Sequence, residues 1–251
     1  MGRNDSLSFT FKGTSSTTMG VHVLSLPDIP VAEERGQEVT IPGRDGTLWL
    51  SEGAYADVEL PFVIEYGATA DLNAIAGWLS GYGELVISTQ SDYCYHARIT
   101  SGFALQHGIY AFGHYRAEIN FVANPYKYVS GNPALPDMTQ STMFDGNGSI
   151  YSRPIIIIYA NGDVNLLVND CSLLIEDIDG YVTIDCEAMM AFKDDVNWGS
   201  KVRLLSNGEV DEWPSLRPYG YTNYVDWYDD DGSESRTHVT KVVVKPNWRW
   251  R

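Results

Sequence analysis

Residues 37–50 have the sequence QEVTIPGRDGTLWL, in which two extended segments flank a turn. Polar and apolar residues alternate up to Ile41, a pattern that is typical of a β-strand. Residues 42–46 (PGRDG) supply the glycine, proline and aspartate that tight turns favour, and an extended pattern resumes at Thr47. This stretch therefore predicts a β-hairpin with a turn built on Gly43 and on Asp45-Gly46.

Short strands are also predicted on both sides of this hairpin, because β-branched and aromatic residues recur between closely spaced turn residues. In the first half of the chain, these strands are expected around Phe9 and Phe11 and at residues 21–24, 58–66, 85–88, 93–99 and 116–122. Ala123-Asn124-Pro125 is expected to end the last of them, since proline cannot donate to a β-ladder.

One segment of the first half has helical periodicity. Leu72, Ile75, Ala76 and Leu79 recur at the spacing of one helix face, which predicts a single helix over about residues 70–80. Thr69 or Asp71 can cap its start through a side-chain oxygen, and Gly81 or Gly83 can end it. Trp78 lies in this helix and is expected to pack in the core.

The composition changes between residues 130 and 152, where Gly, Asn, Pro, Ser, Thr and Asp dominate. Such a stretch is typical of a domain boundary. We expect a first β domain over residues 1–130, a linker or edge segment over 131–152, and a second domain over 153–251.

The second domain opens with four consecutive isoleucines, residues 155–158, which predict a strand buried on both faces. Asn161-Gly162 predicts a hairpin turn to a strand at 164–168. Strands are also expected at residues 173–175 and 181–186, joined by a turn at Asp179-Gly180. A third hairpin is expected around Asp231-Gly232, with strands at 225–228 and 238–244. The fold class is therefore mainly β, with a β-sandwich as the second domain.

The formal net charge of −16 argues against a nucleic-acid-binding protein, because phosphate neutralisation needs clustered Lys and Arg. No apolar run is long enough for a transmembrane helix, and the polar N-terminus does not resemble a signal peptide. We therefore expect no sequence-specific nucleic-acid binding and no membrane insertion.

Metal and cofactor sites are not indicated. Cys94, Cys171 and Cys186 have no paired spacing and are expected to be free thiols. His107 and His114 lack the local clustering of zinc ligands. Residues 229–232 (DDDG) place their acids consecutively, unlike a calcium loop, and are interpreted as a solvated hairpin tip.

The chain has no serine nucleophile motif and no phosphate-binding glycine loop, so we expect neither catalysis nor a cofactor. A pair of carboxylates for glycoside hydrolysis stays open, because 33 acidic residues form many pairs and none stands out. The 7 Trp and 16 Tyr also leave a carbohydrate-binding module open as an alternative function. Its candidate aromatic residues, which serve equally as partner-binding residues, are Trp213, Trp227 and Trp248.

The order of several motifs resembles the distal tail protein family of siphophages and related prophages. The resemblance covers nearly the whole chain. It rests on residues 39–48 (VTIPGRDGTL), 75–79 (IAGWL), 83–88 (GELVIS), 92–98 (DYCYHAR), 119–128 (INFVANPYKY), 180–187 (GYVTIDCE), 213–216 (WPSL) and 245–249 (KPNWR).

This resemblance implies a structural tail-tip protein with an N-terminal β domain, carrying one helix and an extended hairpin, and a galectin-like C-terminal β-sandwich. Six copies would form a ring hub between the tail-tube protein and the tail-tip or tail-associated hub protein, leaving a channel for DNA. Receptor-binding proteins would dock on the C-terminal domains. The implied location is the virion, after synthesis in the cytoplasm of the bacterial host.

The hairpin is the candidate ring interface, because an extended hairpin can add strands to a neighbouring copy. The residues that we assign to this interface are Val39, Ile41, Pro42, Gly43, Arg44, Asp45, Gly46, Leu48 and Leu50. The alternative is that the hairpin folds back onto its own domain.

Overall fold

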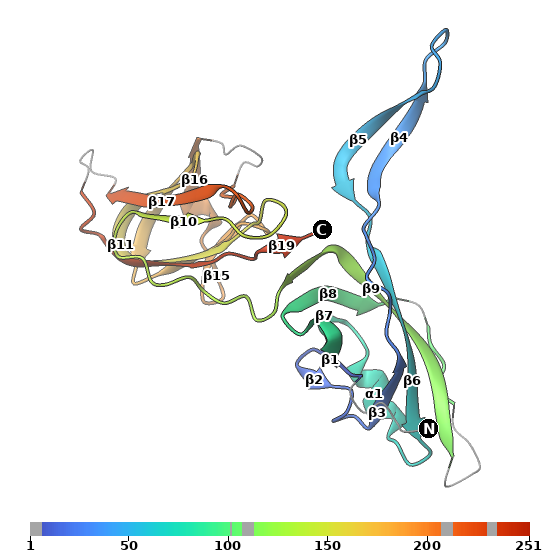
Figure 1. Ribbon diagram of the computed structural model, residues 1–251. Coiled ribbons are helices and arrows are strands. Elements are labelled where there is room, and N and C mark those ends of the chain that lie inside the picture. Colours follow the sequence, from blue (N-terminus) through green and yellow to red (C-terminus); the bar gives the residue numbers. More distant parts are fainter. Residues whose placement is uncertain (1–6, 101, 107–112, 207–212, 230–234) are drawn as a thin grey trace. The chain divides into compact units, whose positions relative to one another are not determined.

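The structure is a computed structural model that describes residues 7–100, 102–106, 113–206, 213–229 and 235–251. The chain divides into two compact units, Met1–Ser130 together with Arg251, and Gly131–Trp250. Strands dominate both units, and the described residues contain one α-helix (Figure 1), which confirms the mainly β fold class. No helix among them has the length and apolar character that crossing a membrane requires.

The first unit is built on an antiparallel sheet with the strand order β2-β1-β7-β8-β9-β6-β3. The alternating burial of these strands directs one face into an apolar core. The strands are β1 (Phe9–Phe11), β2 (Thr14–Ser15), β3 (Val21–Ser25), β6 (Val58–Gly67), β7 (Tyr82–Ile87), β8 (Tyr93–Ile99) and β9 (His114–Val129), and a 3-10 turn (Ser88–Gln90) follows β7.

The predicted helix is confirmed as α1 (Leu72–Trp78), and it packs on the core of this sheet. Asp71 caps it, because its Oδ1 accepts the backbone N–H groups of Asn73 and Ala74, both at 3.0 Å. The Trp78 ring stacks on Phe9 with centroids 5.3 Å apart. Its indole Nε1 donates to the Phe11 carbonyl at 3.0 Å, so the polar end of this buried ring is satisfied.

Strand β9 continues to Val129, so the prediction that Ala123-Asn124-Pro125 ends it is wrong. The pairing of β9 with β8 jumps from Ala97↔Ala123 to Tyr95↔Lys127. Residues 124–126 thus face only residue 96, in a bulge. Proline is tolerated there because a bulged residue needs no ladder hydrogen bond.

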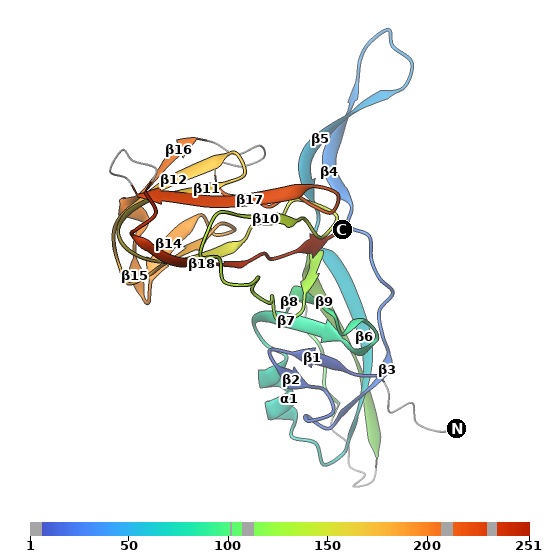
Figure 2. The same cartoon turned by 60° about the vertical axis from the view of Figure 1, so that its left-hand side comes forward.

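The predicted hairpin is also confirmed, as β4 (Glu34–Thr40) and β5 (Thr47–Tyr55), with Thr40 opposite Thr47. These two strands form a two-stranded sheet of their own. Figures 1 and 2 show the hairpin leaving the strands of the larger sheet instead of folding onto them.

Residues 131–152 belong to the second unit by their contacts. Met138 forms an isolated bridge with Val242, and β10 (Thr142–Asp145) is an edge strand paired with β17 (Thr222–Asp229). The other strands of the unit are β11 (Ile155–Val168), β12 (Cys171–Asp179), β13 (Val182–Asp185), β14 (Met190–Lys193), β15 (Val196–Asn197), β16 (Val202–Ser206), β17 (Thr222–Asp229), β18 (Val239–Lys245) and β19 (Arg249–Trp250), with a 3-10 turn at Gly199–Lys201.

The predicted turn at Asn161-Gly162 is wrong, because β11 runs through it as one long strand. Its first half pairs with β13 and β18, and its second half pairs with β12 and β17. The register shifts between Gly162 and Val164, and Gly162 has a φ of 108°. Glycine here permits a bulge that lets one strand serve two sets of strands in the sandwich.

Two further expectations for this unit need correction. Ile156 and Ile158 are fully buried, but Ile155 and Ile157 are only half-buried, so one face of this segment is the core face. Among the described residues, the strands on either side of Asp231-Gly232, β17 and β18, pair with different halves of β11 and not with each other. The turn itself lies outside the described residues.

Candidate functional site

The hairpin carries an exposed apolar surface. Val39 lies opposite Leu48 and Gln37 opposite Leu50, so the side chains of Val39, Leu48 and Leu50 share one face of the two-stranded ribbon, and Ile41 continues this face. We name these four residues the hairpin stripe. Ile41, Leu48 and Leu50 are 39%, 36% and 45% exposed. An isolated two-stranded ribbon is only marginally stable in water, so this surface is one that a partner would be expected to cover.

The tip of the hairpin has the turn geometry that its glycines predict. Gly43 and Gly46 have φ angles of 83° and 77°, where a side chain would be strained. The backbone N–H of Arg44 donates to the carbonyl of Ile41 at 3.1 Å. Pro42, Arg44 and Asp45 are exposed around this turn, so the tip presents both a positive and a negative charge.

Trp49 lies on the opposite face of the ribbon and is 47% exposed. Its ring covers Gly36, where an added Cβ would come within 2.7 Å of the ring and 2.5 Å of the Leu50 carbonyl oxygen. Gly36 therefore lets the indole lie flat across the ribbon. Trp49 is not among the residues predicted for the ring interface.

The structure does not bring the carbohydrate candidates together as an exposed platform. Trp227 is 1% exposed and Trp248 is 8% exposed, while Trp213 is half-buried. Rings that stack on sugars need a free face, so burial argues against Trp227 and Trp248 in that role. Of the two histidines considered for metal, His107 lies outside the described residues, and His114 Nδ1 lies 3.6 Å from a carboxylate oxygen of Glu65.

A buried carboxylate organises the second unit. Asp226 accepts hydrogen bonds from Arg236 Nε and Nη2, at 3.1 and 2.9 Å, and from the hydroxyls of Tyr224 and Tyr228, at 2.6 and 2.5 Å. Burial by itself raises the pKa of Asp226, but the hydrogen bonds from Arg236, Tyr224 and Tyr228 outweigh it and lower the pKa to about 2. The Arg236 guanidinium also lies 4.7 Å from the Tyr228 ring centroid.

Asp229, interpreted above as part of a solvated tip, is in fact buried at the end of β17. Its carboxylate accepts the backbone N–H groups of Thr237 and His238, at 2.7 and 2.9 Å, and the Thr237 hydroxyl at 2.8 Å. Burial raises the pKa of Asp229, and these hydrogen bonds together with one from Ser235 lower it to about 2. Asp229 thus anchors the segment that leads into β18. Residues 230–232 lie outside the described residues.

The two low pKa values predict acid sensitivity. Because the folded pKa of Asp226 is about 2 and its ordinary value is 3.8, the unfolded chain takes up protons first as the pH falls. The carboxylate therefore stabilises the fold fully above pH 3.8, and this contribution is lost as the pH falls toward about 2. We expect urea unfolding between about pH 7 and pH 2.5 to show this loss.

The matched control for this pH dependence is Asp226→Asn, which cannot titrate at this position. The difference in the free energy of unfolding between wild type and Asp226→Asn should become smaller below about pH 4. A gap that stays constant down to the lowest pH would contradict the prediction.

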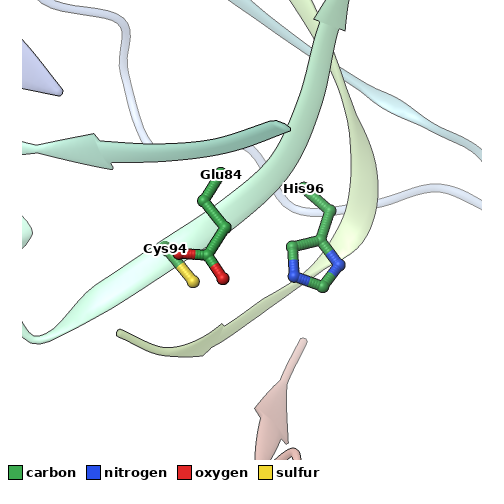
Figure 3. A group of neighbouring side chains, drawn as sticks. All are labelled: Glu84, Cys94 and His96. Atoms are coloured by element: carbon green, nitrogen blue, oxygen red, sulfur yellow. The ribbon is translucent and has the colours of Figure 1, made fainter. Parts of the chain in front are cut away.

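The structure also gathers three side chains that no motif in the sequence connects. Glu84 on β7 and Cys94 and His96 on β8 each place a possible ligand atom within 4.8 Å of the others (Figure 3). We name this group the Glu84–Cys94–His96 cluster. Glu84 is exposed, His96 is half-buried and Cys94 is 1% exposed. Burial, followed by the nearby charge of Glu84, raises the pKa of the Cys94 thiol to about 12.

The register of the sheet explains this cluster. Glu84 lies directly opposite His96, and Cys94 is two residues before His96 on the same strand. All three therefore point to the same face of the sheet, away from Leu85 and Tyr95, which are buried in the core. The sequence signal was Cys-x-His in a predicted strand, but a single sequence does not give the cross-strand partner.

A solved structure shares the architecture of both units. It is the crystal structure of SPP1 Dit (gp 19.1), described as a paradigm of the hub adsorption apparatus in phages that infect Gram-positive bacteria. The superposition has a TM-score of 0.67 and covers 96% of this chain and 98% of that chain, at 16% sequence identity. The chain has the fold of SPP1 Dit.

The sequence matches no protein-family model and no curated protein sequence. At 16% identity, the likeness to SPP1 Dit is carried by the backbone path of both units. It confirms the architecture that the motif order implied, a first β domain with one helix followed by a β-sandwich.

Proposed function

We propose that this protein is a structural distal tail protein of a phage tail tip, acting as a hub between the tail tube and the receptor-binding apparatus. The observation that carries the proposal is the match of both units, in one chain, to a hub protein of the adsorption apparatus over nearly the full length of each. A match to one β-sandwich would say little, because that fold hosts many functions. A match to two different units in the same order along one chain is more specific evidence for function.

The hub is a ring of six copies that assembles through the first unit. The hairpin supports this, because it exposes the hairpin stripe and Trp49 on its two faces. Its strands also leave their outer edges without a partner strand among the described residues. Each hairpin can then add to a neighbouring copy, and head-to-tail contacts of this kind close into a ring when the rotation permits.

The ring leaves a channel for DNA, and the net charge of −16 suits a passage to which DNA must not adhere. One face of the ring binds the tail-tube protein and the other binds the tail-tip or tail-associated hub protein. The galectin-like second units offer docking sites for receptor-binding proteins. The protein works in the virion, after synthesis in the host cytoplasm, and needs neither catalysis nor a cofactor for this role.

A carbohydrate-binding role is the second candidate, although it cannot rest on the buried rings of Trp227 and Trp248. Tyr219 and Tyr221 are 81% and 58% exposed in the second unit, so their rings have free faces. Glycan binding that Tyr219→Ala and Tyr221→Ala abolish would support this role. Binding that persists in both variants would remove it.

The first test of the hub is the mass of the purified protein by light scattering after size exclusion, over a range of concentrations. We expect a species near six times the 28.0 kDa mass of the chain, and sixfold rings by electron microscopy. A monomer at every concentration, both alone and after addition of assembled tail tubes, would contradict the ring.

A further inference from the structure

We propose that Glu84, Cys94 and His96 form a zinc-binding site on the face of the first unit's sheet opposite its apolar core. This site does not depend on the proposed tail-tip function. It rests on the convergence of three ligand atoms of the types that zinc prefers, a thiolate sulfur, an imidazole nitrogen and a carboxylate oxygen.

The spacing is close to that of a bound site. Ligand atoms around a tetrahedral zinc ion lie about 3.5 Å apart, given metal–ligand distances of about 2.0–2.3 Å. The three atoms here are within 4.8 Å of one another, so small side-chain rotations that bring them closer would complete the site. Glu84 is exposed and free to make such a rotation, and its carboxylate lies beside the Cys94 sulfur (Figure 3).

The three side chains form no hydrogen bond or ion pair with one another among the described residues. In the part of the chain that the structure describes, no hydrogen bond or ion pair involves the His96 ring nitrogens or the Glu84 carboxylate. The Cys94 thiol makes one weak contact, to the Val129 carbonyl oxygen at 3.9 Å. A zinc ion would satisfy all three groups at once, with loss of the thiol proton to solvent.

Neighbouring side chains and strands hold Cys94 and His96 in place. The His96 ring stacks on Tyr128, with centroids 4.3 Å apart and planes 14° apart, and Tyr82 meets its edge at 6.2 Å. Cys94 lies opposite Tyr128 on β9, next to the bulge that faces His96. Ligands held by packing in this way lose little freedom on binding. Three protein ligands leave the fourth tetrahedral position for water or for a group from another molecule.

Cobalt absorption spectroscopy tests the site directly. We expect the untagged protein to bind one Co²⁺ per chain, with a near-ultraviolet thiolate-to-cobalt band that Zn²⁺ removes by displacement. Cys94→Ser should abolish the band. Glu84→Gln and His96→Ala should each weaken Co²⁺ binding at least about tenfold, since losing even a group that only orients a metal ligand costs that much.

The chain supplies matched controls. Cys186→Ala removes an equally buried thiol from the second unit, and His22→Ala removes a half-buried histidine from β3 of the same sheet. Both variants should bind Co²⁺ like the wild type. Because Glu84 is exposed, Glu84→Gln should fold normally and keeps the test decisive if Cys94→Ser fails to fold. An absent band in the wild type, or binding unchanged in Glu84→Gln, would overturn the site.

Discussion

Replacing Asp226 with alanine should lower the free energy of unfolding of the second unit by about 3 kcal/mol. The side chain of Asp226 is 1% exposed, and the substitution removes the acceptor for Arg236, Tyr224 and Tyr228 together. Groups that lose a buried partner keep their desolvation cost, which makes truncation of one member expensive. Arg236 is 39% exposed, so its guanidinium can be hydrated by water in the variant. The loss of stability should therefore be smaller than the largest losses known for breaking a buried ion pair.

Asp137→Ala is the matched control for this prediction. Asp137 pairs with Lys241 at 2.7 Å, closer than the Asp226–Arg236 pair at 2.9 Å, but these side chains are 52% and 35% exposed. An exposed pair contributes about 0–1 kcal/mol. Urea unfolding followed by tryptophan fluorescence should therefore separate the two variants. Equal losses would mean that burial of the Asp226 carboxylate does not decide its contribution.

Local signals were enough to predict the helix and the hairpin of the first unit. The helix was predictable because the spacing of Leu72, Ile75 and Leu79 and the cap at Asp71 act within a few residues of each other. The hairpin was predictable because Gly43 and Gly46 need positive φ angles that few other residues adopt. These features do not depend on the rest of the fold.

The errors came where a distant partner decides between two local outcomes. Asn161-Gly162 suits a tight turn and also a bulge, and the pairing of β11 with four other strands selects the bulge. Pro125 would end an isolated strand, but the pairing of β9 with β8 resumes beyond it at Lys127. A single sequence does not contain these pairings in readable form.

The same limit applies to the polar residues. Asp229 looked solvated because it begins an acidic run, yet the backbone N–H groups of Thr237 and His238 need its carboxylate as an acceptor. The Glu84–Cys94–His96 cluster needed the register of β7 against β8 before Glu84 could be placed opposite His96. The sequence shows which residues carry reactive or polar side chains, but it does not show which of these side chains lie close together in the fold.

The second large effect is expected at the hairpin, where replacing both Leu48 and Leu50 with aspartate should convert the proposed ring to monomers. These leucines are 36% and 45% exposed in the single chain, so the substitutions should change its own stability by no more than about 0.5 kcal/mol. In the ring they would leave charges in an apolar contact. At about 2 kcal/mol for each anchor residue, the loss is about 4 kcal/mol per interface, or about a thousandfold in the dissociation constant.

Leu205→Asp is the matched control, because Leu205 is 51% exposed on β16 of the second unit and lies outside the hairpin. Light scattering should give the double variant the mass of one 28.0 kDa chain and leave Leu205→Asp at the mass of the wild type. Circular dichroism should be the same for all three proteins. A ring that survives both aspartates would place the contact between copies outside the hairpin. Loss of the ring in Leu205→Asp as well would show that any added charge disrupts it, so that the hairpin has no special part in assembly.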